Sequence, residues 1–324
     1  MQGALNQNVR LSLKVPSTTG RFFHQTRRTL LYRSGRSTPL TISMARIFVA
    51  GPASGAGKST ISLALLGGLL ESGLYKPEDL AYIKPATQGT QQTLTARYCK
   101  SKNIASEHVG PLVFYKGFTR KFLDGKTEDT ATILNNIKVA VDNIAQDKKV
   151  TIIDGVGHPG VGSIVGASNA DVAKACNASV LIVGKEGVGA CVDTFNLNAA
   201  IFELKAVPVL GLLVNRVSDN KKFLEKMQQV YVYFEKFRPD MKVYGMLKEN
   251  DAFALNLEGY SAPGEHNTCT ITFGAPDRSK LVADPASEEE LALCSKFITA
   301  FLEAIQVESL KQLVSDAAAK SESA

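Results

Sequence analysis

The stretch ARIFVAGPASGAGKSTISLALL, residues 45–66, contains an apolar strand, a glycine-rich turn and the start of a helix in immediate succession. The apolar run at residues 47–50 is typical of a central parallel strand, which is buried on both faces. The glycines that follow allow the backbone to fold closely around an anion, and the helix adds the positive end of its dipole. The stretch therefore predicts an α/β protein with a phosphate-binding loop.

The side chains of this loop suit a nucleotide bound with its metal ion, and Mg-ATP is the predicted ligand. Lys58 can reach the β and γ phosphates while backbone N–H groups form the cradle, and the Ser59 hydroxyl can ligate Mg²⁺. Five residues separate Gly51 from Gly57, one more than in the common pattern. A plain connector without a ligand is the alternative. The predicted nucleotide contacts are Gly55, Ala56, Gly57, Lys58, Ser59 and Thr60.

The chain begins with a basic segment that contains no acid. Eight of the 37 lysines and arginines lie at or before Arg46, and the first acid is Glu71. This composition is typical of an organelle transit peptide, and the arginines favour the mitochondrion over the plastid. A disordered basic tail or nucleic-acid arm is the alternative, with Met44 as the start of a cytoplasmic protein. The expected parts are this extension at residues 1–43, an ATP-binding domain at 44–250, and an appendage at 251–324 that ends in a helix and a disordered tail.

After Arg46 the chain is close to neutral, with 29 basic against 31 acidic residues. This balance argues against a nucleic-acid partner for the folded part. The five cysteines are odd in number and show no paired spacing, which favours a reducing compartment and argues against a structural zinc site. No apolar run reaches the length of a membrane span, so we expect no membrane insertion.

Strand and helix patterns alternate along the rest of the chain. This order predicts a doubly wound, mostly parallel sheet with helices on both faces. Besides residues 47–50, the expected strands are 80–83, 111–115, 150–153, 179–183, 207–214 and an edge strand at 242–246. The expected helices are 60–70, an exposed helix at 88–102, 130–145, a helix capped by Ser168 that runs to 175, 194–204, 221–237 and 288–316.

A carboxylate stands at the end of the buried strand VTIID. If this strand is a neighbour of the first, Asp154 would lie beside the phosphate loop and could hold Mg²⁺ together with Ser59. The glycines at 155–160 also match the dinucleotide pattern GxGxxG. However, Pro159 fits poorly in a loop that opens a helix, and Asp154 would crowd a pyrophosphate. We therefore expect this loop to sense the γ-phosphate or to shape an acceptor site.

Two further side chains are candidates for catalysis. Lys84 follows a strand and precedes proline, so its backbone is extended and its side chain should leave the carboxyl edge of the sheet. There it could bind a substrate carboxylate or developing phosphate charge, although a solvated surface lysine is the alternative. His158 could act as a general base or substrate ligand, and a loop histidine bonded to backbone is equally compatible with the sequence.

The basic and aromatic stretch FYKGFTRKFLDG offers cations for an anionic substrate. Lys116, Arg120 and Lys121 could grip a small anionic metabolite, and the arginine could clamp a carboxylate through two N–H groups. A solvated helix face is the alternative. Asn215 ends the strand VLGLLVN, where its amide could pair with the Watson–Crick edge of adenine.

Four segments, GPASGAGKST, IKPATQG, IIDGVGHPGVGS and LLVNRV, resemble the dethiobiotin synthetase-like family of P-loop NTPases, roughly over residues 45–250. The resemblance implies an ATP-dependent ligase that activates a small carboxylate or carbamate as an acyl phosphate, with the acceptor near a homodimer interface. It assigns Lys58 to the phosphates, and Ser59 with Asp154 to Mg²⁺. Lys84 would meet the reacting acid, and Asn215 would read adenine.

The sequence departs from the synthetases at three points. The acid that closes VTIID is Asp154 where the synthetases have glutamate. No acid lies between Asp79 and Glu107, where they have another magnesium ligand. Met-Leu-Lys follows Gly245 in place of a proline-bearing turn. These differences argue against dethiobiotin synthesis itself.

Two classes of function are compatible with these features. The first is a Mg-ATP-dependent ligase with Lys84 and His158 at the acceptor site. The second is an ATP-switched scaffold, chaperone or regulatory ATPase without ligase chemistry. The lysine before proline favours the ligase, and the missing acid before Glu107 favours the switch. A dimer switch of the chromosome-partitioning kind is disfavoured, because those relatives carry a signature lysine where this chain has Ala53.

Overall fold

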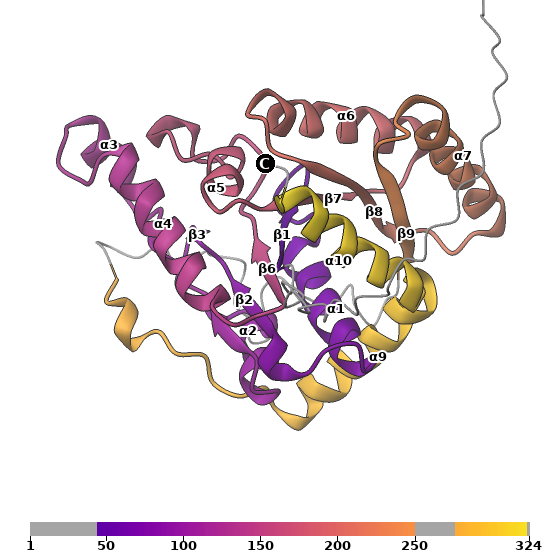
Figure 1. The fold of residues 1–324 in the computed structure, drawn as a ribbon, viewed down its shortest axis with the longest axis horizontal. Coiled ribbons are helices and arrows are strands. Elements are labelled where there is room, and N and C mark those ends of the chain that lie inside the picture. Colours follow the sequence, from indigo (N-terminus) through magenta and orange to yellow (C-terminus); the bar gives the residue numbers. More distant parts are fainter. Residues whose placement is uncertain (1–43, 250–275, 323–324) are drawn as a thin grey trace, which may run out of the picture. The chain divides into compact units, whose positions relative to one another are not determined.

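The computed structural model describes residues 44–249 and 276–322 of the 324-residue chain (Figure 1). Seven parallel strands form one sheet in the order β4-β2-β6-β1-β7-β8-β9. The expected basic extension lies outside the described residues. The strands of this sheet are β1 (Ala45–Ala50), β2 (Leu80–Ile83), β4 (Ala105–Glu107), β6 (Val150–Asp154), β7 (Ser179–Gly184), β8 (Val209–Val217) and β9 (Lys242–Lys248).

Helices cover both faces of the sheet, because the central strands are apolar on both sides. In β1, Ile47 and Val49 belong to one buried cluster, and Phe48 and Ala50 belong to the other. Apolar clusters on both faces of a parallel sheet confirm the doubly wound α/β class. None of the described helices has the length and apolar character to cross a membrane. The first cluster includes residues of α1 (Lys58–Glu71), α2 (Leu94–Ser101), α9 (Glu288–Ile305) and α10 (Val307–Glu322), and the second includes residues of α4 (Thr130–Ala145), α5 (Asn169–Ala175), α6 (Val188–Leu204) and α7 (Lys221–Phe237).

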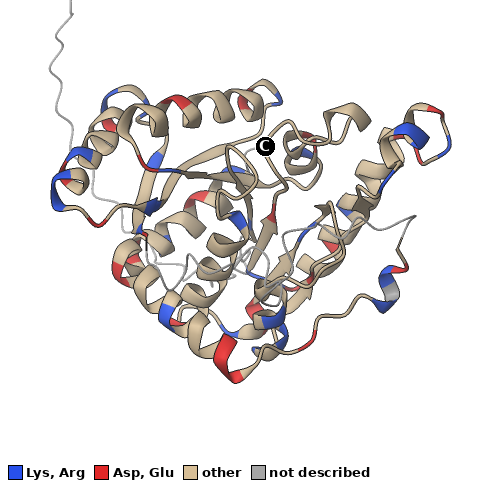
Figure 2. Cartoon of the chain, turned by 180° about the vertical axis from the view of Figure 1, so that it is seen from behind, with Lys and Arg blue, Asp and Glu red and all other residues tan. Residues whose placement is uncertain are grey.

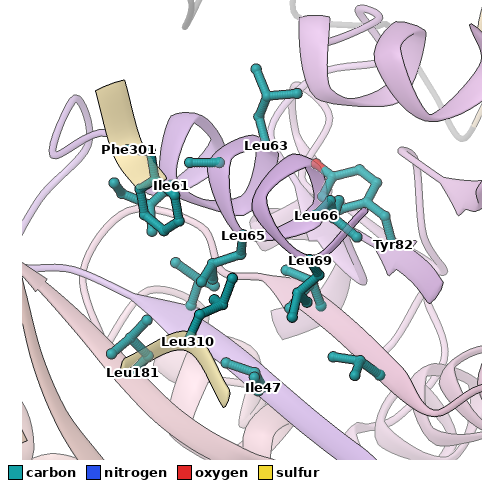
Figure 3. Packing of buried hydrophobic residues seen from close by; sticks show 14 of the residues in the cluster. Ile47, Ile61, Leu63, Leu65, Leu66, Leu69, Tyr82, Leu181, Phe301 and Leu310 are labelled. Carbon is teal, nitrogen blue, oxygen red and sulfur yellow. The ribbon is translucent and has the colours of Figure 1, made fainter. Parts of the chain in front are cut away.

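The C-terminal helices form part of this core. Helix α9 packs directly on α1, where Gly67 and Gly68 leave room for larger side chains. A Cβ atom at Gly67 would lie 2.1 Å from Ile298 Cδ1, and one at Gly68 would lie 3.1 Å from Phe301 Cε1. Helix α10 packs against β1, and Figure 3 shows its Leu310 in the apolar layer below α1. The described part of the segment expected as an appendage therefore contributes α9 and α10 to one face of the sheet.

The C-terminal helical region differs from the expected single helix at 288–316. Gln306 has a positive φ of 51°, and this break in the helical backbone separates α9 from α10. Helix α10 then continues to Glu322 through residues that we expected to be disordered. It is ordered because its apolar side chains, including Val314 and Ala317, are buried against the sheet.

Two further elements near β2 differ from expectation. The exposed helix expected at 88–102 is α2, which begins only at Leu94 and buries one face. Thr93 caps it, since its hydroxyl accepts a hydrogen bond from the Ala96 N–H group. The strand expected at 111–115 is the shorter β5 (Leu112–Val113), which pairs with β3 (Ala86–Thr87) in a separate two-stranded sheet.

We expect Phe301→Ala to lower the free energy of unfolding by about 3–5 kcal/mol, because it removes a fully buried ring between α1 and α9. Urea unfolding followed by circular dichroism would measure the loss. Phe237→Ala is the matched control, since this phenylalanine is 60% exposed at the end of α7. Equal losses in the two variants would show that the C-terminal helices are not part of the cooperative core.

Candidate active site

The turn between β1 and α1 has the backbone geometry of an anion cradle. Gly55 and Gly57 both have left-handed conformations, with φ of 73° and 89°. A Cβ atom at Gly57 would lie 2.2 Å from the Asn215 amide nitrogen, so only glycine fits there. Helix α1 begins at Lys58, and its first N–H groups have no partner within the helix. The predicted contact residues from Gly55 to Thr60 therefore form one continuous turn into a helix N-terminus.

Side chains from the end of β8 support this turn. Asn215 is 5% exposed, and its amide donates to the Ala56 carbonyl at 3.3 Å. Arg216, in a left-handed conformation with φ of 58°, donates to the Gly55 carbonyl at 3.1 Å. The predicted adenine contact of Asn215 stays a prediction, because its amide is hydrogen-bonded to the loop in this structure. Arg216 was not predicted as a site residue, because no sequence pattern indicated its backbone conformation.

Lys58 lies inside the loop rather than on its surface. Lys58 is the first residue of α1, and it is only 6% exposed. Its ammonium group donates to the Ala53 carbonyl at 2.9 Å. The charge is therefore held within the loop, in the position from which a lysine can reach the phosphates of a nucleotide.

Asp154 lies beside the phosphate loop, because β6 pairs with β1 and Asp154 is in register with Val49. The residue is fully buried, and its Oδ2 atom collects three donors. Ser59 Oγ donates at 2.6 Å, the Tyr82 hydroxyl at 3.0 Å and Lys84 Nζ at 3.2 Å. Its Oδ1 atom is buried and has no hydrogen-bond partner among the described residues.

This arrangement fits a magnesium ion. Hydroxyl and carboxylate oxygens are the ligands that Mg²⁺ prefers, and Ser59 and Asp154 bring them into contact at the end of the loop. The unpartnered Oδ1 atom is an additional acceptor in a buried position, where a polar atom without a partner is costly. Ser59 and Asp154 are thus the residues that would hold Mg²⁺, which would neutralise charge on the nucleotide phosphates.

Tyr82 is a site residue that the sequence analysis missed. It lies in β2, is fully buried, and donates its hydroxyl to Asp154. Burial raises its pKa well above the ordinary value, and the neighbouring Asp154 charge raises it further. The phenol therefore stays protonated and remains a donor to the carboxylate at physiological pH. A tyrosine in an otherwise apolar strand was the available signal, since a buried hydroxyl needs a partner.

Lys84 points toward the phosphate loop from the end of β2. Its ammonium group donates to Ser59 Oγ at 3.2 Å as well as to Asp154. Its backbone is fixed on both sides, since its N–H donates to the Glu107 carbonyl and its own carbonyl accepts from Gly110. The alternative of a solvated surface lysine does not hold, because the side chain is only 15% exposed.

His108, a third residue not predicted from the sequence, follows β4 next to Lys84. The residue is 4% exposed, and its Nε2 atom has no hydrogen-bond partner among the described residues. Burial lowers the pKa of this imidazole, and the Lys84 charge lowers it further. The imidazole is therefore neutral at physiological pH and adds no charge to the site.

The loop after Asp154 has a defined shape that depends on Asn169. The Asn169 amide donates to the carbonyls of Val156 and His158 at 2.6 and 2.8 Å. The His158 side chain is exposed, and its Nδ1 atom accepts from the Gly160 N–H group, which is the backbone-bonded alternative. The loop leads into a 3₁₀ turn (Ser163–Val165) rather than an α-helix, so it lacks the context of the dinucleotide pattern.

The basic stretch lies on and before the short helix α3 (Phe118–Leu123). Lys116, Arg120 and Lys121 are all exposed, and Figure 2 shows the basic colouring on this helix. Lys121 Nζ lies 5.3 Å from the centre of the Tyr115 ring. Helix α3 contacts the 3₁₀ turn of the loop after Asp154. Within the described residues, no hydrogen bond joins Arg120 to the cluster around Asp154, so its role in substrate binding stays a prediction.

We expect Tyr82→Phe to lower the free energy of unfolding at pH 7 by about 1.5–3 kcal/mol, the usual contribution of a hydrogen bond to a charged group. The ring remains, so packing is unchanged, and urea unfolding measures the difference. Tyr244→Phe is the matched control, because it removes the same kind of hydrogen bond from Asp316, whose side chain is 21% exposed whereas Asp154 is fully buried. A loss for Tyr82→Phe no larger than for the control would contradict a buried, charged Asp154.

A family match and one relative indicate the same kind of protein. The AAA domain family matches residues 45–252. The ATP-dependent dethiobiotin synthetase BioD of Methanococcus vannielii is 24% identical over 218 residues, which are 67% of this chain and 100% of the synthetase.

Two solved structures match this chain at low identity and low TM-score. The MinD cell division protein of Aquifex aeolicus is 12% identical with a TM-score of 0.40, and the match covers 65% of this chain and 84% of that one. The nucleotide-binding protein of Archaeoglobus fulgidus in complex with ADP is 14% identical with a TM-score of 0.34, over 79% and 87% of the two chains. On the family match and the synthetase relative, this chain belongs to the dethiobiotin synthetase-like family of P-loop NTPases.

Proposed function

We propose that the protein transfers the γ-phosphoryl group of ATP to a small carboxylate or carbamate and so activates it for ligation. The observation that carries this proposal is the cluster of Ser59, Lys84 and Asp154 at the mouth of the phosphate loop. The relative from Methanococcus vannielii is named as an ATP-dependent synthetase, which supports the same class of reaction.

In the proposed reaction, a carboxylate oxygen of the acceptor attacks the γ-phosphorus. A new O–P bond forms, the bond from this phosphorus to the β–γ bridging oxygen breaks, and ADP leaves with the electron pair. Lys58 would hold the phosphates from inside the loop, and Lys84 would orient the acceptor carboxylate by its charge. Such transfer depends on positioning and electrostatic stabilisation, which fixed cations at the end of a helix dipole provide.

The acceptor would lie over the carboxyl ends of β2, β6 and β4, where open α/β sheets bind ligands. Lys84 and His108 lie on one side of this region, and the loop that carries His158 forms another. Helix α3, which contacts this loop, would bring Arg120 toward the far end of a small anionic acceptor. The exposed imidazole of His158 would contact the acceptor rather than the nucleotide.

Positional isotope exchange tests the reaction class. ATP labelled with ¹⁸O in the β–γ bridge would be incubated with a panel of small mono- and dicarboxylates, and of amines with bicarbonate. We expect scrambling of the label only with the acceptor acid, since reversible acyl phosphate formation frees the β-phosphate to rotate. Lys58→Ala should slow the exchange by about one to two orders of magnitude, because it removes a charge-assisted contact of about 1.5–3 kcal/mol.

The same assay separates the ligase from the alternative function. ATP hydrolysis without label scrambling in any panel member would contradict acyl phosphate formation. Release of a captured partner protein by ATP under those conditions would instead support an ATP-switched scaffold or chaperone.

Arg120→Lys tests the proposed acceptor clamp. The variant keeps the charge and loses the forked pair of donors, so we expect the KM for the acceptor to rise about tenfold. The affinity for ATP, measured by calorimetry, should not change. Unchanged turnover in a normally folded Arg120→Ala protein would contradict the clamp and would indicate that α3 is a solvated helix without a binding role.

A further inference from the structure

Lys84 bonds to the same two groups that would hold magnesium. Its ammonium group lies 3.2 Å from Ser59 Oγ and 3.2 Å from Asp154 Oδ2. We propose that Lys84 and Mg²⁺ compete for one cation position, so that arrival of the metal releases Lys84 toward the acceptor acid. The inference rests on the proposed nucleotide and metal site, and it assigns Lys84 two successive partners.

Lys84 already donates to both of the residues predicted to hold the metal, which favours competition. Ser59 Oγ donates its single proton to Asp154 and accepts from Lys84, so Lys84 occupies one of the two lone pairs that a metal could use. Asp154 Oδ2 already accepts from Ser59 and Tyr82 in addition to Lys84. Two cations about 4 Å apart repel strongly in a partly buried site, so a metal on Ser59 Oγ and on either oxygen of Asp154 would weaken the contacts of Lys84 with this pair.

Tyr82 and Lys84 differ in how easily they can leave Asp154. The tyrosine ring is fully buried in β2 and has no room to move. The lysine side chain is partly exposed and flexible, while its backbone is fixed through Glu107 and Gly110. Displacement by a metal would therefore swing only the ammonium group and leave both the strand and the Asp154–Tyr82 bond in place.

The one carboxylate that the neighbouring strand β4 carries is already ion-paired and so is not open to the released ammonium. Glu107, at the end of β4, is ion-paired with Arg278. His108 beside it is buried and neutral. The released charge would therefore attract an anion from outside the chain, such as the carboxylate of the acceptor. Metal and nucleotide would bind first, and by linkage the acceptor would bind more tightly after them.

Binding of Mn²⁺ in the presence of ADP tests the competition without any turnover. Free Mn²⁺ would be followed by electron paramagnetic resonance in wild type and in Lys84→Met. ADP is chosen because it lacks the γ-phosphate, which Lys84 could otherwise contact. We expect the variant to bind Mn²⁺ about tenfold more tightly, the factor that corresponds to one charge-assisted hydrogen bond no longer in competition.

Two controls isolate the effect. Lys311→Met removes a lysine from a surface ion pair on α10 and should leave Mn²⁺ affinity unchanged. Lys84→Gln keeps a donor for Asp154 and so protects the fold, and it should also bind Mn²⁺ more tightly than wild type. The rise in melting temperature on adding Mg²⁺ with ADP gives a second measurement, which should be larger in both Lys84 variants.

The outcomes separate this inference from the proposed function. Wild-type protein that binds Mn²⁺ with ADP, together with Lys84 variants of equal or weaker affinity, would overturn the competition alone. A wild-type protein that binds no Mn²⁺ with ADP would overturn the metal site and the competition together.

Discussion

The buried carboxylate of Asp154 is the constraint on which the site depends. A charged group without contact to water is costly unless donors surround it, and here Ser59, Tyr82 and Lys84 all donate to one of its oxygens. Ser59 belongs to α1, Tyr82 belongs to β2, and Lys84 directly follows β2. Asp154 is the last residue of β6. One carboxylate therefore fixes the phosphate loop, two strands and the candidate acceptor lysine relative to one another.

The strand order makes this convergence possible. β1 lies between β6 and β7, so the loop after β1 has Asp154 on one side and the chain after β7 on the other. β2 lies next to β6, which brings Lys84 to the same edge. From the other end of the described chain, helix α9 packs against α1 and helix α10 packs against β1. The helix that presents the phosphate loop is thus held by segments from both ends of the described chain.

Much of this could be predicted from local sequence. The phosphate loop, the apolar strands and the order of strands and helices follow from spacing and periodicity, and helices such as α4 and α7 have the expected bounds. The C-terminal helices could not be placed, because their apolar faces indicate burial but not the surface that buries them. Gly67 and Gly68 in α1 leave room for Ile298 and Phe301 of α9. The sequence alone does not indicate that a helix packs on these two glycines.

The sequence by itself determined the residue types of the site and its class: a glycine-rich cradle, Lys58, a hydroxyl, and an acid at the end of a buried strand. These are local properties, because they depend on neighbours within one turn or one strand. The tertiary structure alone decided which groups meet. Tyr82, His108 and Arg216 gained their roles, and Lys84 its contact with Ser59 and Asp154, from the pairing of strands far apart in the chain. Such contacts depend on strand order, which residue periodicity does not specify.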